Sequence, residues 1–337
     1  MVNVGVIGYG YWGPNIVRNF MVNSATKVVT VCDRDQERLD RVQALYPSVS
    51  VTRDAAELIA DPSIDAVVTA TPVDSHFDLA MATLKAGKHV LVEKPMTSTS
   101  NQARQLIEEA ARKKLVLMVD HTFVYTSAVR KMREITQQDT FGDLQYYDSV
   151  RVNLGIFQHD VNVLWDLAVH DLSIMGYLIE GQPIAVSATG TSHIAGEPEN
   201  IAFMTVYYEN NLIAHVNVNW LSPVKIRRTL VGGSRKMIVY DDLETSEKLK
   251  VYDKGITIAE NPDDIRKLMI GYRTGDLWSP MLEDTEALAV EVDHFVACIE
   301  GRETPLTGGD EGLTVVRILE AADASMRENG RPIGLGQ

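Results

Sequence analysis

The chain has little cysteine, no long apolar run and fewer basic than acidic residues. Its 337 residues include only two cysteines, Cys32 and Cys298, which excludes a disulfide framework and favours a reducing compartment, the cytoplasm. No apolar run reaches the ~20 residues of a membrane span, and no basic leader precedes the first apolar segment. Lys and Arg total 32 against 46 Asp and Glu, a net charge of −14. Such a chain repels phosphate backbones and anionic membranes, so we expect neither nucleic acid nor membrane as a partner.

The first third of the chain alternates short apolar runs with longer helical patterns. Strands that alternate with helices are typical of βαβ units and a parallel sheet. The pattern therefore predicts an α/β fold that begins with a doubly wound Rossmann domain over residues 1–122. Asp54 and the run 97–100 are typical helix starts, and Gly87 is a typical helix stop. The strands are expected at 2–7, 27–32, 65–70, 88–92 and 115–119, and the helices at 13–22, 34–45, 54–60, 75–86 and 99–113.

After residue 122 strand-like runs dominate, and the rest of the chain, 123–337, is expected to be an α+β domain. Asn210-Asn211 and Gly232-Gly233 have the turn chemistry of hairpins, which indicates a mostly antiparallel sheet. Apolar and polar residues alternate over 212–220, so one face of this sheet is expected to be open. An open face with an exposed edge predicts a homodimer or homotetramer. The strands are expected at 144–153, 184–191, 201–208, 212–220, 226–231 and 236–240, and the helices at 125–137, 161–180, 284–300 and 310–328.

The first expected strand runs directly into the sequence Gly8-Tyr9-Gly10-Tyr11-Trp12-Gly13, which matches the G-x-G-x-x-G dinucleotide fingerprint. Its glycines permit a tight turn and let backbone N–H groups approach a pyrophosphate at a helix N-terminus. Asp33 follows Gly13 by 20 residues, at the end of the next strand, where the fingerprint places the acid that binds the ribose. A carboxylate there repels a 2′-phosphate, so NAD is favoured over NADP. Arg34 offsets this repulsion, stacks on the adenine or is simply solvated.

Four further motifs follow this loop. Thr71-Pro72 with His76 comes after one expected strand, Glu93-Lys94-Pro95 comes after the next, and Asp166 and His170 lie on a helical pattern. A C-terminal pattern of His294-Phe295, Gly301, Pro305 and Gly312-Leu313 completes the set. Together these motifs make the chain resemble the Gfo/Idh/MocA oxidoreductases along nearly its whole length. The resemblance implies a nicotinamide-dependent dehydrogenase that acts on a hydroxyl of a sugar, inositol or related polyol. It also implies that the second domain, 123–337, binds the substrate, and this domain is the one expected to mediate oligomerisation.

Hydride transfer between an alcohol and nicotinamide needs a group that handles the hydroxyl proton and a donor that stabilises charge on the oxygen. Lys94 follows a strand that should end at the ligand-binding edge of the parallel sheet. Asp166 and His170 are four residues apart, so they share a helix face, and histidine titrates near neutrality. With the resemblance, Lys94, Asp166 and His170 are the expected catalytic residues.

The remaining expected contacts come from the same motifs and strand ends. His76 either points toward the nicotinamide or caps a helix, and no metal site is expected because the histidines lack ligand spacing. The expected cofactor contacts are Gly8, Gly10, Tyr11, Trp12, Gly13, Asp33, Arg34, Thr71, Pro72, His76, Glu93 and Lys94, and the expected substrate contacts are His121, Tyr125, Asn153 and Trp165.

The substrate is expected to be a sugar, most simply a nucleotide sugar, because the segments 11–15 and 153–170 resemble the surface-polysaccharide branch of this family. An inositol or polyol dehydrogenase is the alternative enzyme, and a dinucleotide-binding regulator without turnover is an alternative of another class. A diphosphate-linked substrate would need basic side chains in the second domain. The candidates are Arg151, Lys225, Arg227, Arg228 and Arg273. Arg227 and Arg228 alternate on one expected strand and cannot both point inward, and for any single one of the five a solvated surface charge is the favoured interpretation.

Overall fold

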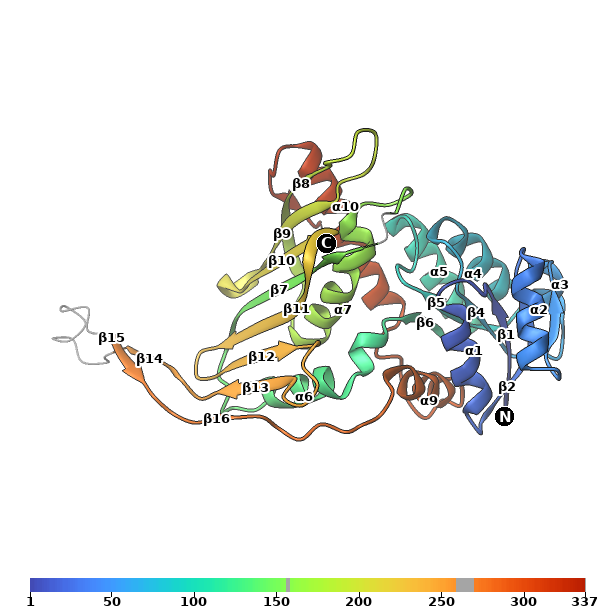
Figure 1. The fold of residues 1–337 in the computed structure, drawn as a ribbon, viewed down its shortest axis with the longest axis horizontal. Coiled ribbons are helices and arrows are strands. Elements are labelled where there is room, and N and C mark those ends of the chain that lie inside the picture. The colour runs from blue at the N-terminus through green and yellow to red at the C-terminus, as the bar shows by residue number, and fades with distance from the viewer. Residues whose placement is uncertain (156–157, 259–269, 337) are drawn as a thin grey trace. The chain divides into compact units, whose positions relative to one another are not determined.

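The computed structural model describes residues 1–155, 158–258 and 270–336, and the chain divides into two compact units (Figure 1). Unit 1 comprises Met1–Thr126 and Thr285–Arg317, and unit 2 comprises Ser127–Asp284 and Ile318–Gln337. The single boundary expected near residue 122 differs from this division, because residues 285–317 return to unit 1. Helix α10 (Gly309–Arg327) begins in unit 1 and ends in unit 2.

Unit 1 contains a six-stranded parallel sheet in the order β3-β2-β1-β4-β5-β6. This is the strand order of a doubly wound Rossmann sheet, which confirms the expected fold class. The edge strand β3 was not expected, because three residues are too few for a periodic pattern. The strands are β1 (Val2–Ile7), β2 (Thr26–Cys32), β3 (Ser50–Thr52), β4 (Ala66–Thr69), β5 (His89–Glu93) and β6 (Leu117–Asp120).

Helices cover both faces of this sheet (Figure 1). Right-handed crossovers place α1 and α2 on one face and α3, α4 and α5 on the other, where α4 contacts both of its neighbours. Helix α9 joins the first face, where Phe295 packs edge-on against Phe20 of α1. The helices are α1 (Gly13–Val22), α2 (Gln36–Leu45), α3 (Ala55–Ala60), α4 (His76–Lys85), α5 (Ser100–Lys113) and α9 (Ala287–Ile299), with short 3-10 turns η1 (Val73–Ser75) and η2 (Thr122–Tyr125).

The local start and stop signals of these helices act as the sequence predicts. The Asp54 carboxylate accepts a hydrogen bond from the Ala56 N–H at 2.8 Å, and the Thr99 hydroxyl accepts one from the Gln102 N–H at 3.2 Å. Each side chain satisfies a donor that the first helical turn leaves without a partner. Gly87 has a φ of 80°, the left-handed conformation that ends a helix.

Unit 2 contains a nine-stranded mixed sheet in the order β16-β13-β12-β11-β7-β10-β9-β8-β17. Only the β7–β10 pair is parallel among the described pairs of this sheet, so the expected mostly antiparallel sheet is confirmed. Its strands are β7 (Leu144–Leu154), β8 (Pro183–Thr191), β9 (Ile201–Tyr208), β10 (Ile213–Asn219), β11 (Leu221–Gly233), β12 (Met237–Asp241), β13 (Leu249–Tyr252), β16 (Leu277–Trp278) and β17 (Ile333–Gly334). A separate ribbon pairs β14 (Gly255–Ile258) with β15 (Ile270–Arg273), and η4 (Glu209–Asn211) is a short turn.

The two faces of the unit 2 sheet differ in chemistry. Val216 and Val218 on β10 are fully buried, whereas His215 and Asn217 alternate with them on the opposite face. Helix α6 (Ser127–Thr136) and helix α7 (Val169–Leu178) belong to this unit and contact each other. Phe203 is 44% exposed on the open face, next to polar neighbours. This arrangement matches the expected open-faced sheet.

Across the described residues, no helix combines the length and apolar character needed to cross a membrane.

Candidate active-site residues in the two units

The register of the unit 1 sheet brings the loops after four strands to one edge. Ile7 pairs with Thr69, Thr69 pairs with Val92, and Glu93 pairs with Asp120, so the strands end side by side. Because the strands are parallel, the loops that follow β1, β4, β5 and β6 all leave the sheet at its carboxyl edge. Open α/β sheets bind ligands at this edge.

The glycine loop leaves room for a ligand at one position only. Gly8 has a φ of 101°, and a Cβ built there would lie 2.3 Å from the Ala70 carbonyl oxygen. A Cβ at Gly13 would lie 2.5 Å from the Gly8 carbonyl oxygen. A Cβ at Gly10 would meet only the Arg38 side chain, at 3.5 Å. Gly8 and Gly13 are therefore needed by the fold, whereas Gly10 leaves the backbone open to an approaching pyrophosphate.

The two aromatic residues of this loop differ in environment. Tyr11 is 91% exposed, while the Trp12 indole Nε1 donates to the Asp120 carboxylate at 2.7 Å. Tyr11 is thus available to a ligand at the surface. Trp12 connects the loop after β1 to the end of β6.

Asp33 is a buried carboxylate at the end of β2. Its Oδ2 accepts from the Tyr9 N–H at 2.7 Å, and its Oδ1 accepts from the Asp35 N–H at 2.9 Å. Burial acts to raise the pKa of Asp33, but these two hydrogen bonds and the nearby Arg38 outweigh it and lower the pKa. Asp33 is therefore ionised at neutral pH, and its bond to Tyr9 holds the glycine loop in place.

Two arginines lie near Asp33. Arg34 is exposed, and its carbonyl oxygen accepts from Arg53 Nε at 3.1 Å. Arg38, which the sequence did not single out, places Nη1 3.4 Å from Asp33 Oδ2. Its position in the first turn of α2, five residues after Asp33, was a usable signal, because this turn lies beside Gly10 and Asp33.

His76 holds two loops of the carboxyl edge together. Its Nε2 lies 2.7 Å from the Thr71 carbonyl oxygen and its Nδ1 lies 2.9 Å from the Pro95 carbonyl oxygen. Burial lowers the pKa of His76, although the two carbonyl groups act in the other direction. Because both ring nitrogens face backbone oxygens, the geometry favours a positioning role for His76. Thr71 and Pro72 then follow β4 in fixed positions.

Lys94 and His121 follow the neighbouring strands β5 and β6. The Lys94 N–H donates to the Glu93 carboxylate, and the Lys94–Pro95 peptide bond is cis. His121 is 1% exposed, and neither of its ring nitrogens has a hydrogen-bond partner among the described residues. Burial, followed by the charge of Lys94, lowers the pKa of His121 to about 3. His121 is therefore a neutral imidazole that offers one donor and one acceptor at this edge.

Tyr125 is packed in the core of unit 1. It is 1% exposed, and its hydroxyl lies 3.1 Å from the Thr307 Oγ1. Burial, with the charge of Glu291, raises the pKa of Tyr125 well above its usual value. These surroundings favour a structural role over the expected substrate contact.

In unit 2 the helical segment that carries Asp166 and His170 begins with a π turn, η3 (Leu164–Ala168), before α7. The expected single helix over 161–180 is therefore shorter and begins irregularly. Trp220 Nε1 donates to Asp166 Oδ2 at 2.9 Å, a contact that the sequence did not predict. Asp166 and His170 are both half-buried and remain about one turn apart.

Trp165 and Asn153 have different surroundings. Trp165 is 8% exposed, and its indole Nε1 donates to Asp323 Oδ2 at 2.8 Å. Asn162 donates to the other oxygen of Asp323 at 2.8 Å. This pair of contacts favours Trp165 as a support of the π turn. Asn153 is half-buried near the end of β7 and stays a candidate substrate contact.

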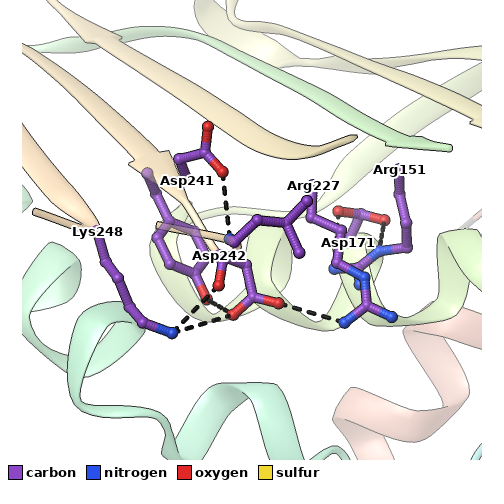
Figure 2. A network of polar contacts seen from close by, with 8 residues as sticks. Arg151, Asp171, Arg227, Asp241, Asp242 and Lys248 are labelled. Carbon is purple, nitrogen blue, oxygen red and sulfur yellow. Dashed lines mark hydrogen bonds and ion pairs between the residues drawn. The ribbon is translucent and has the colours of Figure 1, made fainter. Parts of the chain in front are cut away.

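Four of the five basic residues expected to hold a diphosphate are paired with carboxylates of unit 2. Arg151 pairs with Asp171, and Figure 2 shows Arg227 beside it, directed at Asp242. The partner of Arg228 is Asp241 at 2.8 Å, and that of Arg273 is Asp253 at 2.6 Å. Lys225 is exposed. These ion pairs favour a structural role for the four arginines, and the cluster of basic donors stays a prediction. Sequence alone does not show which acids fold against them.

The C-terminal His294 has a structural role. Its Nδ1 lies 2.6 Å from Glu303, and its Nε2 accepts from the Leu306 N–H at 3.0 Å. These contacts hold the loop after α9 against the helix. No group of three metal-ligating side chains occurs within the described ranges.

The sequence and the fold of the chain are similar to those of known oxidoreductases. Residues 2–121 match the family described as "Oxidoreductase family, NAD-binding Rossmann fold", and residues 129–239 match the "GFO/IDH/MocA C-terminal domain". The UDP-N-acetylglucosamine 3-dehydrogenase of Acidithiobacillus ferrooxidans is 27% identical over 95% of each chain. The inositol 2-dehydrogenase of Rhizobium meliloti (strain 1021) is 25% identical over 97% of each chain. The solved structure of GenD2 from gentamicin A biosynthesis in complex with NAD has a TM-score of 0.83 at 23% identity and covers 100% of this chain and 97% of that chain.

Proposed function

Because the chain belongs to the Gfo/Idh/MocA family of oxidoreductases, we propose that it is an NAD-dependent dehydrogenase of a ring hydroxyl on a sugar. Unit 1, which includes the expected domain 1–122, binds the cofactor in this proposal, and unit 2, which includes most of 123–337, binds the substrate. The observation that carries the proposal is the carboxyl edge of the unit 1 sheet. There an open Gly10 backbone, an ionised Asp33 and Lys94 follow β1, β2 and β5 of the same parallel sheet.

The residues present fit a dinucleotide. Gly10 leaves the space that a pyrophosphate needs, and Asp33 supplies an acceptor for ribose hydroxyls. NAD is proposed over NADP because the Asp33 carboxylate is buried and charged. Calorimetry with NADH and NADPH tests this, and Asp33→Ser is expected to narrow or reverse the preference. Tighter NADPH binding to the unmodified protein would show that Arg34 and Arg38 dominate instead.

When bound, the nicotinamide supplies the hydride acceptor or donor. Oxidation of the alcohol also releases the hydroxyl proton, and His170 is proposed to take it. Lys94 is proposed to donate a hydrogen bond to the reacting oxygen, and Asp166, held by Trp220, to orient His170 or the substrate. The neutral His121 is proposed to bind a substrate hydroxyl with the ring nitrogens that no described residue uses.

Substitution separates these roles. Lys94→Ala and His170→Ala are each expected to lower turnover by at least ~100-fold, the scale of a lost acid–base group. NADH affinity should stay near normal in His170→Ala. Asp166→Asn should act through His170, so the double variant falls short of additive. Near-normal turnover in His170→Ala would remove this residue from proton handling.

A nucleotide sugar is the proposed substrate, with Asn153 and His121 as contacts. The pairing of Arg151, Arg227 and Arg228 with carboxylates favours an uncharged substrate as the second candidate, which is an inositol or another cyclic polyol. The test is to incubate enzyme and NAD with nucleotide sugars, free sugars and inositols and to follow reduced nicotinamide. Turnover confined to inositols would replace the first candidate by the second. Tight NADH binding without turnover on any compound would favour the alternative of a dinucleotide-binding regulator.

We also propose that the protein is a homodimer or homotetramer in the cytoplasm. The apolar Phe203 and Ile213, each 44% exposed, lie on the open face of the unit 2 sheet and support self-association there. Cys32 and Cys298 are free and buried, which fits a reducing compartment. Sedimentation of the purified chain tests the first point, and a monomer at micromolar concentration would contradict it.

A further inference from the structure

Glu291 on helix α9 is an acidic side chain buried inside unit 1. It is fully buried, and neither carboxyl oxygen has a hydrogen-bond partner of ordinary donor geometry among the described residues. An ionised carboxylate in such a place would carry a large desolvation cost. The carboxyl group must therefore be protonated, or it must lie beside a cation.

The groups that face Glu291 are acidic or neutral. They are the carboxyl group of Asp120 at the end of β6, that of Glu93 at the end of β5, and the hydroxyl of Thr122. Tyr125 of η2 also lies close to Glu291. Burial, then the charge of Asp120 and a hydrogen bond with it, raises the pKa of Glu291 well above its usual value. The cation that α1 supplies near this helix, Arg18, is paired with Glu286 instead.

Asp120 is already committed to two donors. The Trp12 indole donates to its Oδ2 at 2.7 Å, and the Thr122 hydroxyl donates to its Oδ1. Two carboxyl groups in contact need one proton between them. Because the Trp12 indole and the Thr122 hydroxyl already donate to Asp120, the proton belongs on Glu291, whose O–H then donates to Asp120.

Trp12 makes this contact relevant to the cofactor. It lies between Gly10 and Gly13 and immediately precedes the first residue of α1, whose N-terminus faces the dinucleotide in the family. In the sheet, β1 and β6 are separated by β4 and β5, so the indole connects the glycine loop to a distant strand. Whatever holds Asp120 also holds this loop.

We propose that Glu291 is a positioning residue for the cofactor: its carboxylic acid donates to Asp120, and Asp120 holds Trp12 and with it the glycine loop. Loss of the Glu291 donor leaves Asp120 with one acceptor site unsatisfied in a buried place. The Trp12 contact then weakens, and the loop populates arrangements that do not bind a dinucleotide. The inference rests on dinucleotide binding by the glycine loop, and not on the identity of the sugar.

The first test compares three variants by NADH binding at neutral pH. Glu291→Gln keeps a donor for Asp120 and is expected to bind within about twofold of the unmodified protein, whereas Glu291→Leu removes the donor and is expected to bind about 5- to 30-fold more weakly. Glu286→Gln is the matched control, because it changes an exposed acid at the start of the helix that carries Glu291, and it should bind normally. Normal binding by Glu291→Leu, or equal losses in Glu291→Gln and Glu291→Leu, would overturn the proposal.

The second test asks whether Glu291 acts through Trp12. Trp12→Phe removes the indole donor, so Glu291→Leu should have little further effect on NADH affinity in that background. A merely structural Glu291 predicts losses that multiply, and that result would overturn the proposal. Turnover plays no part in this cycle, so a wrong substrate assignment leaves it readable.

The third test detects the proton itself and does not depend on the leucine variant folding. The infrared spectrum at neutral pH should contain a carbonyl band of a protonated carboxylic acid, present in Glu286→Gln and absent in Glu291→Gln. The absence of this band from the unmodified protein would show that Glu291 is ionised and would overturn the proposal.

Discussion

Replacing Asp171 by Asn is expected to lower the free energy of unfolding by about 3–5 kcal/mol, the cost of breaking a buried ion pair. Arg151 Nε donates to Asp171 Oδ2 at 2.7 Å, and Nη2 donates to Oδ1 at 3.3 Å. The two side chains are only 4% and 2% exposed. Burial acts to lower the pKa of Arg151, but the charge and hydrogen bonds of Asp171 outweigh it and raise the pKa. The guanidinium therefore stays charged, and Asp171→Asn leaves that charge uncompensated.

The same sheet contains a control of the same chemistry. Arg228 Nη2 lies 2.8 Å from Asp241 Oδ2, but the Arg228 side chain is 55% exposed. Exposed pairs of this kind contribute about 0–1 kcal/mol, because water screens them. Asp241→Asn should therefore cost little, and the difference between the two variants isolates the effect of burial.

Urea unfolding at neutral pH, at low and high salt, measures both losses. The loss in Asp171→Asn should persist at ~1 M salt, whereas any loss in Asp241→Asn should disappear there. The double variant Arg151→Met/Asp171→Leu should recover most of the stability, because it buries no charge. The reasoning is refuted if Asp171→Asn loses less than about 1 kcal/mol or no more than Asp241→Asn.

Three further outcomes are expected. Folding raises the pKa of Glu291, so its proton stabilises the fold fully below the unfolded pKa of about 4.3, and this contribution is lost as pH rises to the folded pKa. Between these two pKa values, urea unfolding should show Glu291→Gln gaining stability relative to the unmodified protein by up to about 1.4 kcal/mol per pH unit. Gly10→Ala should keep its free energy of unfolding within about 0.5 kcal/mol but bind NADH about tenfold more weakly, whereas Gly8→Ala should lose more than about 2 kcal/mol of stability because of its positive φ and the nearby carbonyl. Trp220→Phe should lower turnover about tenfold at unchanged NADH affinity by removing the donor to Asp166, and equal turnover in this variant and the unmodified protein would contradict that link.

The parts of the fold that follow from local chemistry could be predicted from the sequence. Strand β1 has the expected bounds, and the caps at Asp54 and Thr99 lie where the sequence places them. Each of these depends on residues within a few positions of one another. The edge strands β3, β16 and β17 were not predicted, because they have two or three residues and are defined only by the strand beside them.

Long-range pairing could not be predicted. Arg18 and Glu286 are 268 residues apart, yet their contact joins the start of α9 to α1 within unit 1. The partners of Arg151 and Arg228 are likewise set by strand and helix packing, which the one-dimensional pattern does not contain. For the same reason the sequence indicated the glycine loop and Asp33 but gave no indication that Glu291 faces Asp120.

The π turn at Leu164–Ala168 shows how such packing shapes the candidate catalytic residues of unit 2. A π turn is rare and holds its backbone less well than an α turn, so it persists only where side chains support it. Asn162 Oδ1 accepts from the Leu164 N–H at 3.0 Å and its amide donates to Asp323, which also accepts from Trp165. Trp220 then fixes Asp166 within the turn. His170 follows one turn later, in α7. The start of that helix is therefore set by these side-chain contacts, which the helical pattern of the sequence does not show.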